Sequence, residues 1–82
     1  MRNCVYVLES VAQPERHYTG LTADVRSRLA WHNDGRSLHT AKFRPWRLIV
    51  AITFADVATA EEFERYLKSE SGRAFARRHF ER

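Results

Sequence analysis

The spacing of apolar residues predicts two strands that should belong to one sheet. Residues 4–8, Cys-Val-Tyr-Val-Leu, form a continuous apolar run rich in β-branched and aromatic side chains, which is typical of a strand buried on both faces. Residues 46–54, WRLIVAITF, carry the strongest strand pattern in the sequence. On a period of two, one face of this strand carries Trp46, Leu48, Val50, Ile52 and Phe54, and the other carries Ile49 and Ala51.

A polar connection follows the first strand and predicts a hairpin. Residues 10–15 include Pro14 and have hairpin length, so residues 17–19 should return antiparallel beside the first strand. This pairing would bring Tyr6 close to Tyr18. Two tyrosines on neighbouring strands are most often an ordinary packing pair, so their proximity alone does not indicate a site.

Residues 23–33 have the period of an amphipathic helix. Thr22 is expected to cap its start, and the negative charge of Asp24 suits the helix dipole in the first turn. The stripe that should face the core carries Val25, Leu29 and His32. Arg28 lies beside this stripe, one turn before His32. Because arginine is rarely buried without an anion, its position predicts either a structural carboxylate across the core or an anion that arrives from outside.

Two more helices are expected in the last third of the chain. The first begins at Thr59, whose spacing to Glu62 fits a capping box. Its apolar stripe carries Ala60, Phe63 and Leu67. Residues 69–72 should break this helix, and residues 73–80 should form a short final one. The final helix would be anchored by Phe75 and Phe80, with Arg73, Arg77 and Arg78 outward.

Glu64 is the most informative carboxylate, because it lies at the edge of the apolar stripe rather than on the solvent face. It stands four residues before Lys68, and by spacing alone a surface ion pair is the commoner outcome. The alternative is a carboxylate held at the border of the core for chemistry. The two interpretations predict different effects of neutralising Glu64.

Length and composition limit the classes of protein. The 82 residues suffice for one modest core, so a single domain over residues 1–82 is expected. The sequence has no apolar run of about 18 residues that would span a membrane, and its start lacks the features of a signal peptide. The lone Cys4 is typical of a reducing compartment and predicts a cytoplasmic location. Glycine-rich phosphate loops, paired-cysteine zinc spacings and serine nucleophile motifs are absent from the sequence.

The net charge of +4 is unevenly distributed. Residues 1–48 hold eight basic and four acidic side chains, whereas residues 49–82 hold six of each. The cations that we expect to meet nucleic-acid phosphates lie on the first helix and in the loop of residues 36–45; they are Arg26, Arg36, His39, Lys42 and Arg44. Charge alone does not decide the matter, because a small basic domain also gains solubility from it.

Four short motifs, taken in order, resemble those of the GIY-YIG nuclease family. Cys-Val-Tyr at 4–6 matches the GIY element, and Tyr-Thr-Gly at 18–20 matches YIG. Arg28 and His32 in RSRLAWHN match the helix signature, and Ala60-x3-Glu64-x2-Leu67-Lys68 matches the metal-binding helix. The resemblance covers residues 2 to about 80 and is greatest to small stand-alone members related to the nuclease module of the bacterial excision-repair incision subunit. Cys4 replaces the first glycine and Thr19 replaces the isoleucine, and neither change removes a reactive group.

The resemblance implies an α/β (α+β) fold, in which helices flank a small three-stranded antiparallel sheet in the order β-β-α-β-α-α. It also implies one active site on a single concave face, built from Tyr6, Tyr18, Arg28, His32 and Glu64. Glu64 would hold a single Mg²⁺ or Mn²⁺ ion, and Arg28 would stabilise charge on the phosphoryl group. Tyr6 or Tyr18 would be the general base, with His32 close enough to polarise one hydroxyl. Lys42 or Lys68 would add a phosphate contact.

The implied function is that of a metal-dependent endonuclease that cleaves DNA, or RNA, with low sequence specificity in repair or processing. Two alternatives remain, a non-catalytic nucleic-acid-binding module and an accessory protein that works through a partner. The complete set of tyrosine, arginine, histidine and glutamate argues against a decayed enzyme, since half-buried charges are costly to keep without a use. The oligomeric state does not follow from the sequence.

Overall fold

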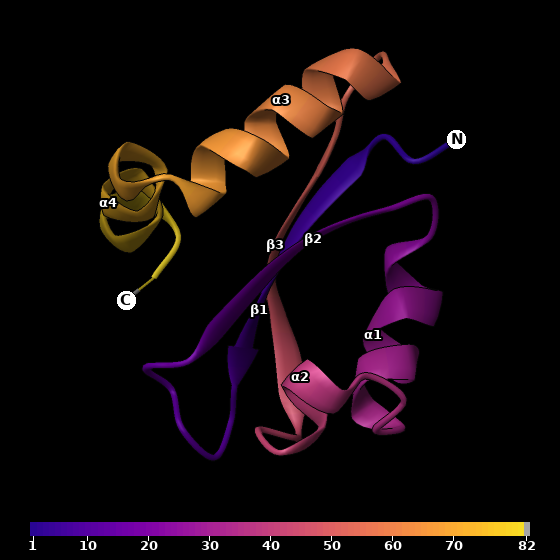
Figure 1. The fold of residues 1–82 in the computed structure, drawn as a ribbon, viewed down its shortest axis with the longest axis vertical. Helices are drawn as coiled ribbons and strands as arrows, with labels where there is room; N and C mark the ends of the chain where they lie inside the picture. The colour runs from indigo at the N-terminus through magenta and orange to yellow at the C-terminus, as the bar shows by residue number, and fades with distance from the viewer. Residues whose placement is uncertain (82) are drawn as a thin grey trace.

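A three-stranded antiparallel sheet forms the centre of the protein, in the strand order β2-β1-β3. The computed structural model describes residues 1–81, and Arg82, the last residue of the expected domain, lies outside the described residues. The strands are β1 (Cys4–Ser10), β2 (His17–Thr22) and β3 (Trp46–Thr53). The helices are α1 (Val25–Asn33), α2 (Leu38–Ala41), α3 (Val57–Lys68) and α4 (Glu70–His79). This arrangement confirms the predicted fold, with the short helix α2 added to it (Figure 1).

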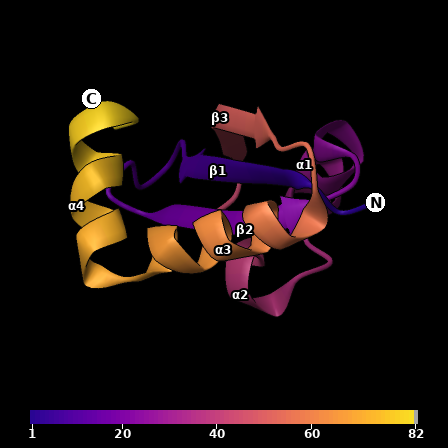
Figure 2. The same cartoon turned by 90° about the horizontal axis from the view of Figure 1, so that it is seen from above.

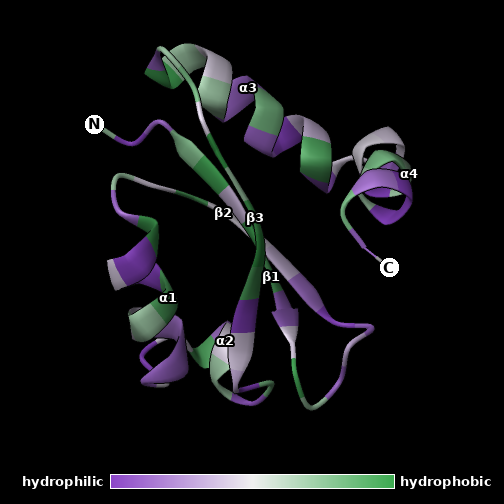
Figure 3. Ribbon diagram, turned by 180° about the vertical axis from the view of Figure 1, so that it is seen from behind, coloured by the Kyte–Doolittle hydropathy of each residue, from purple (hydrophilic) through white to green (hydrophobic). Residues whose placement is uncertain are grey.

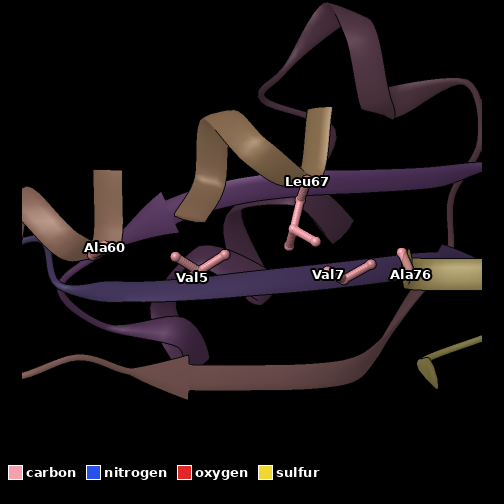
Figure 4. Close-up of a cluster of buried hydrophobic side chains, with 5 residues drawn as sticks. All are labelled: Val5, Val7, Ala60, Leu67 and Ala76. Carbon is pink, nitrogen blue, oxygen red and sulfur yellow. The ribbon is translucent and has the colours of Figure 1, made fainter. Parts of the chain in front are cut away.

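Helices cover both faces of the sheet, and each face has its own apolar cluster. On one face, α3 and α4 pack on Val5 and Val7 through Ala60, Leu67 and Ala76 (Figure 4). On the other face, α1 packs on Tyr6, Leu8 and Trp46 through Val25 and Leu29. Figure 2, seen from above, shows β1 between β2 and β3, with α1 and α3 on either side of the sheet. The predicted burial of the first strand on both faces is confirmed, since all of β1 is buried.

The face assignment predicted for residues 46–54 is wrong, because β3 contains a bulge. Val7 pairs with Val50 but Leu8 pairs with Leu48, so Ile49 is an extra residue on β3. An extra residue reverses the alternation of side chains beyond it. Val50 therefore joins the cluster around Val5, while Trp46 joins the cluster around Tyr6.

Both predicted caps are replaced by an aspartate. The α1 helix begins at Val25, and the side chain of Asp24 accepts a hydrogen bond from the Ser27 amide at 3.2 Å. The expected cap, Thr22, instead forms a turn with Asp24. The Asp24 amide donates to the Thr22 hydroxyl at 3.1 Å. The α3 helix begins at Val57, and Asp56 accepts from the Thr59 amide at 2.7 Å. An aspartate just ahead of each helix lies closer to the free amides than the predicted threonines do.

The α4 helix begins earlier than predicted, at Glu70, so residues 69–72 do not form a break. Ser69 is at once the last cap of α3 and the first cap of α4, where its hydroxyl accepts from the Gly72 amide at 3.2 Å. A side chain at position 72 would collide with the backbone carbonyl of Tyr66. Glycine therefore permits this tight corner.

The buried and exposed positions of α3 and α4 agree with those predicted from the sequence. Figure 3 shows apolar and polar positions alternating along α3, and Ala60 and Leu67 are buried. Phe75 and Phe80 pack against the cluster beneath α4, as expected. The arginines of α4 are exposed, namely Arg73, Arg77 and Arg78. Within residues 1–81, each helix is too short or too polar to cross a membrane.

Candidate active site

Gly20 makes room for Tyr6 across the edge strand. The two residues pair directly in the β1–β2 ladder, and a Cβ at position 20 would overlap the Tyr6 hydroxyl and the ring carbon that carries it. The Tyr6 ring thus lies over β2 on the face covered by α1. This close approach gives the glycine of the Tyr-Thr-Gly motif a steric reason.

A chain of buried hydrogen bonds runs inward from the Tyr6 hydroxyl. Tyr6 Oη lies 2.9 Å from His32 Nε2, and His32 Nδ1 lies 2.8 Å from Thr40 Oγ1. The Thr40 carbonyl accepts from Trp46 Nε1 at 2.8 Å. Tyr6, His32 and Thr40 are each at most 2% exposed. Helix α2, which the sequence analysis expected to be loop, holds Thr40 in this chain.

The protonation of this chain follows from its burial. Burial, and then the neighbouring charge of Arg28, lower the pKa of His32, so its ring is neutral near pH 7. Burial, and then Tyr18, raise the pKa of Tyr6, so its hydroxyl keeps its proton. We assign Tyr6 as the donor to His32 Nε2, which leaves Nδ1–H to donate to Thr40.

Arg28 is held by an aromatic ring. Its guanidinium carbon lies 4.5 Å from the centre of the Trp31 ring, and within residues 1–81 its guanidinium forms no ion pair with a carboxylate. Of the two predicted partners, the structural carboxylate is therefore excluded among the described residues. Stacking uses the face of the guanidinium and leaves its N–H groups, which point outward in the plane, available to an anion.

Tyr18 joins the cluster from β2. Its ring centre lies 6.2 Å from that of Tyr6 and 4.8 Å from that of His32. The predicted proximity of the two tyrosines is confirmed. Tyr18 also borders a groove on the far side of β2, beside Lys68 of α3. Its ring packs on the α1 face of the sheet, and the residue is half-buried.

Glu64 lies on α3, which packs on the opposite face of the sheet from α1, so the five residues do not share one face as expected. It forms an ion pair with Lys68 at 2.6 Å, which the spacing predicted, and its side chain is 17% exposed. Arg28 lowers the pKa of Tyr6 and Glu64 raises it, although both effects are smaller than that of burial. Both charges thus lie near the Tyr6 hydroxyl. The edge of β2, rather than a face, joins these residues.

The residues present fit an ion such as Mg²⁺ that takes some of its ligands from the phosphates of the substrate. Within residues 1–81 no group of three histidine, cysteine or carboxylate side chains could form a complete cage. Mg²⁺ commonly keeps several waters and uses one or two carboxylates together with substrate phosphates. Glu64 is a partly exposed carboxylate of this kind, and its present partner Lys68 is half exposed and displaceable.

The basic residues predicted to bind nucleic acid lie around α1 and α2. They are all exposed: Arg26, Arg36, His39, Lys42 and Arg44. Three have partners within the protein: Arg44 Nε donates to the Ala41 carbonyl at 2.8 Å, Lys42 lies over the Phe43 ring, and Arg36 forms an ion pair with Asp34 at 4.0 Å. Their contact with nucleic acid stays a prediction.

Sequence reasoning missed three residues of the cluster, namely Gly20, Trp31 and Thr40. Gly20 was noted only as part of a motif, although a glycine opposite a tyrosine is a visible signal once the register is known. Trp31, three residues after Arg28, has the spacing of a helical neighbour and could have been identified. Thr40 had no periodic signal.

The candidate site thus holds two tyrosines, a buried histidine and an arginine beside a tryptophan at one edge of a small sheet, with a carboxylate on the helix that covers the other face. Residues 2–78 match the family model of the GIY-YIG catalytic domain, and the chain belongs to the GIY-YIG family. Nucleases of this family generally depend on a divalent metal.

Two curated relatives support this assignment. The chain is 37% identical over 71 residues to "Structure-specific endonuclease subunit SLX1" of Candida dubliniensis, covering 78% of this chain and 25% of that protein. It is 40% identical over 58 residues to a UPF0213 protein of Streptococcus pyogenes serotype M3, covering 71% of this chain and 58% of that protein. The chain thus spans about a quarter of the first relative and somewhat over half of the second. No solved structure matches the sequence significantly.

Proposed function

We propose that this protein is a metal-dependent endonuclease that hydrolyses DNA phosphodiester bonds with low sequence specificity. One observation carries the proposal: the Tyr6 hydroxyl lies 2.9 Å from His32 Nε2, and the Tyr18 ring packs against both residues, so the motif tyrosines and histidine meet at one place. Family membership and the name of the Candida relative, a structure-specific endonuclease subunit, support it.

Each residue has a task in this proposal. Tyr6 takes a proton from the attacking water while passing its own to His32 Nε2, which neutral His32 can accept. Thr40 fixes the His32 ring in the orientation that keeps Nε2 free as an acceptor. Arg28, stacked on Trp31, places its N–H groups against the phosphoryl oxygens as their charge grows. Tyr18 is the second candidate base.

Glu64 would hold the divalent ion, Mg²⁺ or Mn²⁺. When bound, such an ion supplies charge stabilisation to the phosphate and lowers the pKa of a bound water. The Lys68 ammonium would be released from Glu64 and become available to a phosphate oxygen. Base-reading elements are not part of this arrangement, which is the reason for proposing low sequence specificity.

The test compares Glu64→Gln with Glu61→Gln, an exposed residue of the same helix. Labelled single-stranded, duplex and branched DNA are incubated with each protein in Mg²⁺, Mn²⁺ or EDTA. We expect metal-dependent cleavage by the parent protein and by Glu61→Gln, and a loss of several orders of magnitude in Glu64→Gln. Near-normal cleavage by Glu64→Gln, with stability lowered by up to about 1 kcal/mol, would restrict Glu64 to its ion pair with Lys68.

The non-catalytic alternatives have distinct outcomes in the same experiment. A parent protein that binds DNA but cleaves no substrate in any metal would be a binding module. Cleavage that requires an added protein would indicate an accessory subunit. DNA repair is the proposed setting, and it follows only if branched or damaged DNA is the preferred substrate.

A further inference from the structure

A groove of about 510 Å³ lies between β2 and the corner where α3 meets α4. Three cations border it on the helical side, namely Lys68, Arg73 and Arg77, and Tyr18 borders it on the sheet side. These three cations lie outside the basic region of residues 1–48 in which nucleic acid was expected to bind, whereas Arg16, which also borders the groove, belongs to that region. Within the described residues, the exposed cations around α2 do not border this groove.

The groove is continuous with the candidate active site. Tyr18 packs against His32 on one side and borders the groove on the other. Lys68 borders the groove and pairs with Glu64 at 2.6 Å. Tyr6 and Glu64 do not border the groove themselves, so a chain that occupies it would contact their neighbours Tyr18 and Lys68.

The sign of the charged side chains changes along the length of the groove. From the corner outward, Lys68, Arg73 and Arg77 come first, and Glu81 follows one turn after Arg77. Glu81 lies 3.7 Å from His17 at the far end, where Glu15 and Arg16 of the hairpin also border the groove. The cationic part is thus nearest the site. Arg73 and Arg77 are separated by about 6 Å along the helix, which is between one and two nucleotide steps of a strand.

We propose that the cationic part of this groove binds a single strand of DNA through its sugar-phosphate backbone, on one side of the phosphate that reacts. This inference rests on the proposed nuclease function. The groove has the size of a small-ligand site, which suits one strand rather than a duplex. The far end of the groove is mixed in charge, with Glu15, Arg16 and Glu81, so the run of cations that would hold the strand is short.

The test measures binding of a labelled single strand and of the matching duplex across a salt series. All proteins carry Glu64→Gln and are kept in EDTA, so that no DNA is consumed. The variant Arg73→Gln/Arg77→Gln removes two groove cations, and Arg78→Gln removes an exposed cation of the same helix that does not border the groove. Glutamine is a good helix former, so α4 is preserved.

For single-stranded DNA, we expect the salt dependence of log K to lose about 0.7 per phosphate contact, or about 1.4 for the double variant. Arg78→Gln should leave the slope unchanged, and the double variant should lose less affinity for the duplex than for the single strand. Equal weakening by Arg78→Gln and by the double variant, or an unchanged slope in the double variant, would overturn the groove proposal.

Cleavage by the parent protein, measured in parallel, separates this inference from the proposed function. If the parent cleaves DNA while the groove variants bind like the control, only the groove proposal fails. If the parent binds DNA through the groove but never cleaves it, only the nuclease function fails. If the parent binds no DNA at all, both fail.

Discussion

The ring of Tyr6 occupies the space that a side chain at Gly20 would need, because the two residues face one another across the β1–β2 ladder. Gly35 is the one glycine with a positive φ within residues 1–81, so the backbone at Gly20 would tolerate other residues. The requirement for glycine at position 20 therefore comes from contact with Tyr6 rather than from the backbone conformation. Gly20, a motif residue with no reactive group, is thus required by Tyr6, a motif residue that carries a reactive hydroxyl.

The first prediction is that Gly20→Ala destabilises the protein by about 1–3 kcal/mol, because the new methyl group overpacks against the Tyr6 ring. Urea unfolding measures the change. The same substitution made in a Tyr6→Leu background should cost much less, since the far atoms of the ring are gone. An equal cost in both backgrounds would contradict the steric explanation.

The second prediction concerns the Thr40 hydroxyl, which accepts a hydrogen bond from His32 Nδ1. Thr40→Val should lower the free energy of unfolding by about 1–3 kcal/mol, because it leaves the buried Nδ1–H of His32 without a partner. Thr40→Ser keeps the hydroxyl and should preserve cleavage, whereas Thr40→Val should lower it. Unfolding and cleavage are measured on both variants. Identical behaviour of the two would show that the hydroxyl does not matter.

The third prediction is a pH dependence of stability that comes from His32. Its pKa in the folded protein lies below the ordinary value of 6.5, through burial and Arg28. Just below pH 6.5 the unfolded chain therefore binds a proton at this residue and the folded chain does not. The contribution of His32 is complete above pH 6.5 and is lost as pH falls toward the folded pKa.

The measurement is the free energy of unfolding between pH 8 and 5, compared with His32→Asn. The lowered pKa values of Glu9, Asp24 and Asp56 act at more acidic pH, because their unfolded values lie near 4. The difference between parent and variant should shrink as pH falls below 6.5. A difference that is constant with pH would rule out this contribution.

The fourth prediction is that Trp31 positions Arg28. A stack of this kind contributes about 0.5–1 kcal/mol at a partly exposed site, so Trp31→Leu should lower the cleavage rate about 2- to 5-fold. Trp31→Phe keeps an aromatic face and should restore most of the rate. If Leu and Phe at this position gave the same rate, the stack would have no role beyond packing.

The sequence predicted those parts of the fold that leave a periodic trace. Burial of β1 and the stripe of Val25, Leu29 and His32 follow from apolar spacing, which records which side chains face the core. The bulge at Ile49 leaves no such trace, because alternation continues unbroken in the sequence while the backbone shifts register. The α2 helix is too short to show a period, so Thr40 could not be recognised.

The sequence predicted which residues form the candidate site, but it did not predict how they are arranged around the sheet. The motifs identified Arg28 and Glu64, yet they gave no indication that the two helices lie on opposite faces of the sheet. What brings both charges near one hydroxyl is the length of the Tyr6 side chain and the absence of one at Gly20. Such a relationship depends on strand register, which apolar spacing alone does not define.

Ser69 is the entire connection between α3 and α4, and Gly72 lets the two helices meet without a gap. The two helices thus have a one-residue connection, and both also pack on the cluster around Val5 and Val7. The groove beside this corner would then keep one width, and any change of shape would have to come from the molecule that enters it. Stiff DNA would then be excluded by its own resistance to bending, while frayed, gapped or branched DNA would pass. Selectivity for shape would thus need no moving part in the protein.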